Sequence, residues 1–266
     1  DLQAGEYARA ETSARLLYDR FGDSSNDIES SGAATQLGRV LREMGKYAEA
    51  ETLLRQALAR RERLLGETHD RTIASRFLLA KALIPLGKYA EADAVLKRAL
   101  DAQHRGGRRG GAEELRIINL LGVVQLQLGR HAEAETMLKK ALADTRDLDD
   151  SKELRTRAGT LNILARTLNA AKHFPEAEKY ARESISLRER LGGTNIAEVS
   201  KTQLVLGRAL IGQNKLAEAE TVLRRYLRRL KAAEVAPESK VLSPKSKVSE
   251  AKLPDLILID GGKGQL

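Results

Sequence analysis

The heptapeptide Gly45-Lys46-Tyr47-Ala48-Glu49-Ala50-Glu51 decides the fold, because the chain repeats it. Its second alanine recurs at positions 10, 50, 92, 134, 177 and 219, with spacings of 40, 42, 42, 43 and 42 residues. The other copies occupy residues 5–11, 87–93, 129–135, 172–178 and 214–220. A period held this closely over six copies predicts a stacked array, in which each unit packs on its neighbours.

Each copy of the heptapeptide stands between two apolar stripes of helical spacing. In the first complete unit, Leu37 and Leu41 belong to the stripe before the turn, and Ala50 and Leu54 to the stripe after it. Gly45 separates the two stripes. The pattern therefore predicts two antiparallel helices per unit, joined by a tight turn.

The repeats divide the chain into three predicted parts. Residues 1–230 form the array, which begins with one helix at 1–22 that matches the second half of a pair and continues as five pairs from about residue 31. Residues 231–252 are rich in Ala, Pro, Ser, Lys and Glu and predict a flexible linker. Residues 253–266 are an apolar run followed by glycines, which predicts a short strand-like segment.

Small residues recur at one position of the first helix, twelve residues before the repeated alanine of the second. They are Gly38, Ala80, Gly122, Ala165 and Gly207. Small side chains at both positions predict a close approach of the two helix backbones, with larger neighbours interdigitating around them. The acidic residues of the heptapeptide stand at the start of the second helix, where they favour the helix dipole.

This spacing of small residues, with Gly-Lys-Tyr at the turn, resembles the tetratricopeptide repeat. The 42-residue period, together with Leu-Leu-Gly-Glu-Thr-His-Asp at residues 64–70, resembles the kinesin-light-chain type of that family, and residues 188–193 partly echo this ending. The resemblance covers about 230 of the 266 residues. It implies an all-α, right-handed superhelical solenoid of antiparallel helix pairs that serves as a non-catalytic interaction scaffold.

The last 14 residues, 253–266, resemble the core strand of the endonuclease domain in UvrC-type excision-repair subunits. The resemblance implies that Asp260 matches a metal-binding catalytic carboxylate of an RNase-H-like fold. The other carboxylates and the rest of the sheet do not follow in this sequence. We therefore expect no nuclease activity from it, whether a longer protein is cut here or the segment is an appended peptide.

The amino-acid composition further limits the kinds of partner and site that the chain can have. The chain has a formal net charge of +9 and no cysteine, so acidic partners are favoured, and disulfides, thiolate metal sites and a cysteine nucleophile are excluded. No catalytic or zinc arrangement stands out, and we expect no metal and no cofactor. No apolar run approaches the roughly 20 residues of a membrane-spanning helix. We expect an intracellular protein of the cytoplasm or an organelle matrix, and the initial Asp1 leaves open a removed targeting segment.

The concave side of such a solenoid is lined by the first helix of each pair. The position after the small residue is basic in four of five units, at Arg39, Lys81, Arg166 and Arg208. The fifth unit has Val123 there. Cations at one register predict a basic groove that binds an acidic or extended peptide segment of a protein partner.

Two further positions extend this predicted groove. Arg116 and Lys201 stand six residues before the small residue. Asn119 and Asn162 stand three residues before it, and the family resemblance implies that they are similar to asparagines that clamp the backbone of an extended peptide.

The alternative is a nucleic-acid-associated adaptor, whose repeats carry a truncated UvrC-like nuclease domain. Its candidate contacts are Arg105, Arg108 and Arg109, in a glycine- and arginine-rich segment at residues 105–111. This segment is either a surface loop or a phosphate-contacting one.

Overall fold

The computed structural model describes residues 2–21, 28–145, 151–192 and 196–235. Every regular element within these ranges is helical. The elements are α1 (Leu2–Phe21), α2 (Ile28–Glu43), α3 (Tyr47–Leu65), α4 (Asp70–Leu83), the 3-10 turn η1 (Ile84–Leu86), α5 (Tyr89–Arg105), α6 (Ala112–Gln127), α7 (His131–Asp144), α8 (Ser151–Ala170), α9 (Phe174–Arg190), α10 (Ile196–Gly212) and α11 (Leu216–Val235).

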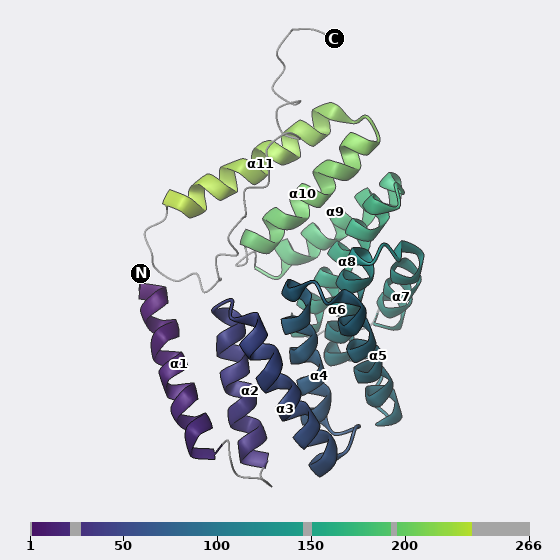
Figure 1. Cartoon of the computed structure of the whole chain (residues 1–266). Coiled ribbons are helices and arrows are strands. Elements are labelled where there is room, and N and C mark those ends of the chain that lie inside the picture. Colours follow the sequence, from purple (N-terminus) through teal and green to yellow (C-terminus); the bar gives the residue numbers. More distant parts are fainter. Residues whose placement is uncertain (1, 22–27, 146–150, 193–195, 236–266) are drawn as a thin grey trace.

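The predicted solenoid of helix pairs is confirmed. Helix α1 packs on α2, and the pairs follow one another along a curve from α1 at one end to α11 at the other (Figure 1). We call α2, α4, α6, α8 and α10 the inner helices and their partners α3, α5, α7, α9 and α11 the outer helices. Inner helices of neighbouring pairs pack on each other, as α6 does on α8 and α8 on α10, which places them on the inner side of the curve.

The positions at which α11 and α4 end can be explained from the sequence. Helix α11 runs to Val235, five residues into the segment predicted as linker, because Lys231-Ala232-Ala233-Glu234 are good helix formers and the first proline follows at Pro237. Helix α4 ends at Leu83, and a 3-10 turn that contains Pro85 follows it. The rest of the predicted linker and the strand-like segment at 253–266 lie outside the described residues.

The turn inside each pair explains why the heptapeptide begins with glycine. Gly45, Gly87 and Gly129 have φ angles of 80°, 73° and 72°, a left-handed conformation that costs glycine little. Lys172 and Asn214 occupy the same position in the last two copies, with φ angles of 63° and 60°. The backbone of all five turns is therefore alike, and the fourth pair uses a residue type that disfavours it.

The predicted close contact between paired helices is formed by a leucine of the outer helix. Leu54 and Ala50 are completely buried, and a Cβ atom added to Gly38 would lie 2.9 Å from Leu54 Cγ and 3.4 Å from the Ala50 carbonyl oxygen. At Gly207 the added atom would lie 2.8 Å from Leu223 Cδ2. The inner helix thus needs a small residue because the leucine four positions after the repeated alanine fills the space.

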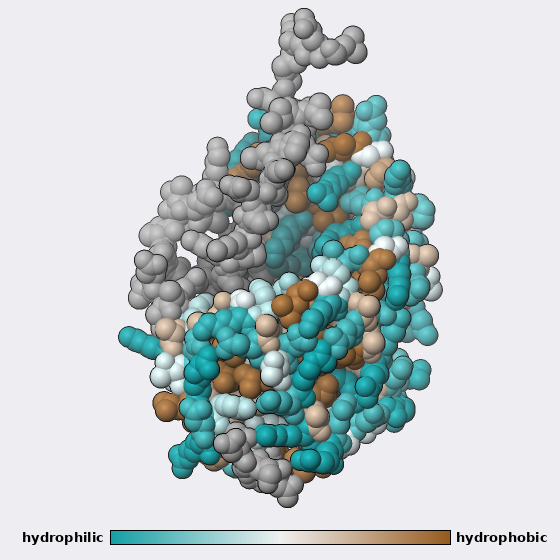
Figure 2. Space-filling model, viewed as in Figure 1, coloured by the Kyte–Doolittle hydropathy of each residue, from teal (hydrophilic) through white to brown (hydrophobic). Residues whose placement is uncertain are grey.

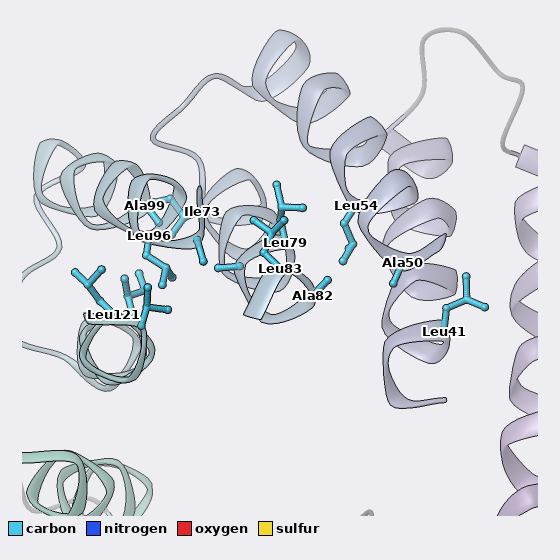
Figure 3. Packing of buried hydrophobic residues seen from close by; sticks show 14 of the residues in the cluster. Leu41, Ala50, Leu54, Ile73, Leu79, Ala82, Leu83, Leu96, Ala99 and Leu121 are labelled. Carbon is cyan, nitrogen blue, oxygen red and sulfur yellow. The ribbon is translucent and has the colours of Figure 1, made fainter. Parts of the chain in front are cut away.

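Buried side chains connect each pair to the next. Leu41, Leu54, Leu83, Leu96 and Leu121 come from successive helices between α2 and α6 and belong to one cluster, part of which Figure 3 shows. Two further clusters continue this core through α6–α10 and α8–α11. No pair has a separate core, so stability depends on the interfaces between repeats.

Ion pairs also join the repeats, and the sequence interpretation of the acidic residues as helix-dipole partners missed them. The second acidic residue of each heptapeptide bonds to the cationic or histidine residue just before the outer helix of the next copy. The pairs and their N–O distances are Glu11–Lys46 (2.8 Å), Glu51–Lys88 (2.8 Å), Asp93–Arg130 (3.1 Å), Glu135–His173 (3.6 Å) and Glu178–Lys215 (2.8 Å). We call this set the motif ladder.

A second cation strengthens most steps of the motif ladder. It stands four residues after the acidic residue and bridges to the first glutamate of the next copy. These bridges are Arg15–Glu49, Arg55–Glu91, Lys139–Glu176 and Arg182–Glu218. The central carboxylates are mostly buried, since the side chains of Glu51 and Asp93 are only 10% and 8% exposed. Each is compensated by two cations, which is the condition for burying a charge.

The pKa of the Glu178 carboxyl group shows the effect of this pairing. Burial raises the pKa of its carboxyl group, but hydrogen bonds from Lys215, Gln213 and Arg182 outweigh this effect and lower the pKa to about 2. The carboxylate therefore stabilises the array at neutral pH.

The contact at Gly38 predicts opposite effects for one substitution at two sites of α2. Gly32→Ala adds a methyl group with no atom within 4 Å and should raise the free energy of unfolding by about 0.5–1 kcal/mol through helix propensity. Gly38→Ala presses on Leu54, so it should be less stable than Gly32→Ala by about 1–3 kcal/mol in urea denaturation followed by circular dichroism. Equal stability of the two variants would contradict the packing account.

The motif ladder predicts acid sensitivity. Because the pKa of Glu178 in the folded state lies below its ordinary value of 4.5, its contribution is present above about pH 4.5 and is lost as the pH falls toward 2. Glu178→Gln should cost about 1–2 kcal/mol at pH 7 and flatten the dependence of the free energy of unfolding on pH in this window. Glu6→Gln, at an exposed residue of α1 outside the ladder, is the control and should leave the profile of the parent chain unchanged.

Candidate functional site

Four cations occupy equivalent positions on the inner helices. Arg39, Lys81, Arg166 and Arg208 each follow the small residue that faces the outer helix, and we call them the cation row. Arg39 and Arg208 are exposed, and Lys81 and Arg166 are half-buried. Figure 2 shows hydrophilic residues in the visible part of the hollow between the two ends of the array. The structure thus brings four of the predicted groove residues to one register of the inner helices.

Among the described residues, the cation row lacks the counter-ions that the motif ladder has. No carboxylate of the described residues lies within 4.0 Å of a nitrogen of its four side chains. Burial lowers the pKa of Arg166, and the neighbouring charge of Arg208 lowers it further. These two residues stand on adjacent helices, α8 and α10, so like charges meet there without an acid between them.

Lys81, on α4, lies in a similar basic cluster. Burial is the main cause that lowers the pKa of Lys81, and the charge of Arg42 lowers it further. Glu43 opposes the shift, whereas Arg116 and Arg39 support it. The cluster therefore favours binding of a negative group over a further cation.

Phe77 organises part of this cluster. Its ring is 6.0 Å from Lys81 Nζ and 5.1 Å from the guanidinium carbon of Arg116, which comes from the next inner helix. Such cation–π contacts hold the two charges near the ring. Arg116 also pairs with Glu113 on its own helix, at 2.8 Å.

The two asparagines are only partly accessible on the inner helices α6 and α8. Asn119 donates a hydrogen bond from Nδ2 to the carbonyl oxygen of Thr156 on α8 at 3.2 Å, and Asn162 is only 9% exposed. The Oδ1 atoms of both have no hydrogen-bond partner among the described residues. Asn119 thus links two repeats, and the clamping of a peptide backbone by either asparagine stays a prediction. Lys201 is exposed and pairs with Glu198, three residues before it, at 2.9 Å.

A cavity of about 480 Å³ opens between α6, α8, α9 and α10. Its lining residues are Arg116, Asn119, Lys152, Arg155, Thr156, Gly159, Arg188, Leu191, Glu198 and Val199, and we call it the basic cavity. Sequence reasoning named only the first two. The repeat pattern of the inner helices could have predicted Arg155, because this residue stands seven residues before Asn162 on the same side of α8. Arg188 could not be predicted in this way, because it comes from an outer helix.

The predicted nucleic-acid contacts are mostly engaged within the protein. Arg105 pairs with Glu67 at 2.7 Å, and Arg108 pairs with Asp70 at 3.2 Å. These bonds tie the connection after α5 to the turn before α4. Arg109 is exposed and makes no ion pair with a described residue.

The described residues offer neither a metal-binding cluster nor a membrane-spanning helix. No group of three His, Cys, Asp or Glu residues there could hold a metal ion. None of the described helices combines the length and apolarity that a membrane crossing requires. Asp260, the residue that matches a catalytic carboxylate in UvrC-type subunits, lies outside the described residues.

Family comparison agrees with this architecture. The tetratricopeptide repeat family matches residues 30–105, 78–147 and 156–232, and the chain therefore belongs to this family. Its fold is that of a protein–protein interaction scaffold. The UvrC RNase H endonuclease domain matches residues 205–266. The structure describes residues 205–235 of this range, which contain the end of α10 and all of α11, the two helices of the fifth pair.

Solved structures share the fold at low sequence identity. BtubC (BKLC) from P. vanneervenii superposes with a TM-score of 0.72 at 21% identity, covering 89% of this chain and 96% of that one. A Podosopora anserina protein described as a kinesin light chain with nearly identical repeats has a TM-score of 0.63 at 22% identity, covering 77% and 96%. A Rap protein complexed with Competence and Sporulation Factor has a TM-score of 0.61 at 16% identity, covering 88% and 67%. No curated protein sequence matches the chain.

Proposed function

We propose that this chain is a non-catalytic scaffold that holds an acidic, extended segment of a partner protein against its inner helices. The observation that carries the proposal is the cation row, whose four side chains have no carboxylate within 4.0 Å among the described residues. Like charges on adjacent helices repel each other in the free protein. A bound carboxylate would relieve that repulsion and gain charge-assisted hydrogen bonds.

The geometry favours an extended ligand over a folded one. Packed helices are about 8–10 Å apart, and an extended chain of the polyproline II type rises about 3.1 Å per residue with three residues per turn, so every third residue would face the same side and meet a new inner helix. The repeated register of Arg166 and Arg208 on α8 and α10 suits such a ligand. The Rap protein of similar fold, solved in complex with Competence and Sporulation Factor, supports the idea that this fold can hold a partner.

Reversing two charges of the cation row tests the proposal. A fluorescent twelve-residue peptide with glutamate at every third position should bind the full chain, and Arg166→Glu with Arg208→Glu should weaken binding at least about a hundredfold. The matched control, Lys140→Glu with Arg225→Glu, changes the same charge at exposed outer-helix residues and should leave the affinity nearly unchanged. Fluorescence anisotropy measures binding, and circular dichroism checks that both variants fold. If both double variants weakened peptide binding equally, binding would depend only on the overall charge of the chain, and the proposal would be wrong.

A nucleic-acid-associated adaptor is the second candidate, favoured by the match of residues 205–266 to the UvrC RNase H endonuclease domain. Because Arg105 and Arg108 already pair with acids, Arg109 is the residue of that loop best placed for a phosphate. This candidate predicts that the chain binds a 16-base-pair DNA duplex with a steep dependence on salt and that Arg109→Glu weakens that binding about tenfold. A titration with a flat salt response would count against it.

A further inference from the structure

Among the described residues, the lining of the basic cavity holds more cations than acids. Its lining includes the cations Arg116, Lys152, Arg155 and Arg188 and the single acid Glu198. Glu113 compensates two of these cations from the edge, through ion pairs with Arg116 and Lys152. Arg155 has no carboxylate within 4.0 Å among the described residues. Four cations of the described lining thus stand against two described carboxylates, those of Glu198 and Glu113, and a bound anion would improve this balance.

The three arginines approach the cavity from three different helices. Arg116 belongs to α6, Arg155 to α8 and Arg188 to α9. The side chain of Arg188 is only 13% exposed and is held in place by Glu198, at 3.5 Å, and by Ser184, at 3.5 Å. A guanidinium group presents a planar fork of donors that matches two oxygens of a phosphate. Three such groups from different directions fit a tetrahedral group with three terminal oxygens better than a planar carboxylate.

Gly159 keeps the cavity open. It lies on α8 and lines the cavity, and a Cβ atom built on it would meet only Asn119 Nδ2, at an ordinary distance of 3.4 Å. A larger side chain here would project into the cavity without meeting backbone. Leu191 and Val199 add apolar contacts to the lining, which suits the methylene or methyl group of an amino acid that carries the anion.

We propose that the basic cavity binds the phosphate of a phosphorylated serine or threonine in the segment that the inner helices hold. This inference rests on the proposed function and assigns the cavity within it: the cation row contacts carboxylates of the segment, and the cavity takes one phosphorylated side chain. A phosphoseryl group carries a charge of about −1.5 to −2 at pH 7 and three acceptor oxygens, and so it neutralises more of the cavity than glutamate does. The partner is therefore a protein whose acidic segment is phosphorylated.

The test compares three degenerate fifteen-residue peptide libraries of Glu, Ser and Ala with a fixed centre of phosphoserine, serine or glutamate. Binding to the full chain is measured by fluorescence anisotropy. The phosphoserine library should bind at least about tenfold tighter than the serine library, and glutamate should recover only a small part of the difference. Gly159→Leu, which narrows the cavity, and Arg155→Ala should each abolish the preference, whereas Arg225→Ala, at an exposed arginine of the outer helix α11, should retain it.

The outcomes separate this inference from the proposed function. Equal binding of the phosphoserine and serine libraries, with sensitivity to Arg166→Glu and Arg208→Glu, overturns the phosphate site and leaves the acidic groove standing. A preference that survives Gly159→Leu also overturns it. Inorganic phosphate that binds as tightly as the phosphoserine library would make the free anion the ligand and would overturn the phosphoseryl assignment. Binding by none of the libraries overturns both proposals.

Discussion

The structure depends on one repeated electrostatic link: a largely buried carboxylate of each heptapeptide that the next repeat compensates with a cation or a histidine. Glu51 and Glu178 show its form, with one cation from their own helix and one from the following turn. A buried carboxylate without these partners would be costly, so each repeat is stable only when its neighbour is in place. The same residues that build the turn therefore also set the distance between repeats.

This link also decides how charge is distributed over the molecule. Cations of the motif ladder are matched by acids of the neighbouring repeat, whereas Arg39, Lys81, Arg166 and Arg208 on the inner helices have no carboxylate of the described residues within 4.0 Å. The positive charge behind the net value of +9 is consequently not distributed evenly over the molecule. Its uncompensated part includes the inner side of the curve, where neighbouring helices present the same type of side chain at the same register. Recognition of an acidic segment would follow from this separation.

Much of the fold could be predicted from the sequence, because period, turn glycine and small residues are local signals. The pairing of α1 with the first repeat and the tight contact at Gly38 follow from them. The motif ladder could not be derived with the same ease, since its partners are about 35–38 residues apart and only the stacked repeats bring them together. The basic cavity was missed for a related reason: Arg188 reaches it from an outer helix, outside any inner-helix register.

The central claim is that an acidic segment lies along the cation row of the inner helices, which has no carboxylate of the described residues within 4.0 Å. Photo-crosslinking tests it most directly, with the glutamate peptide carrying a diazirine residue at its centre and the products mapped by mass spectrometry on the full chain. The account predicts crosslinks to α8 and α10 around Arg166 and Arg208 and their loss when excess unlabelled peptide is added. Competable crosslinks confined to the outer helices α7, α9 and α11 would contradict it.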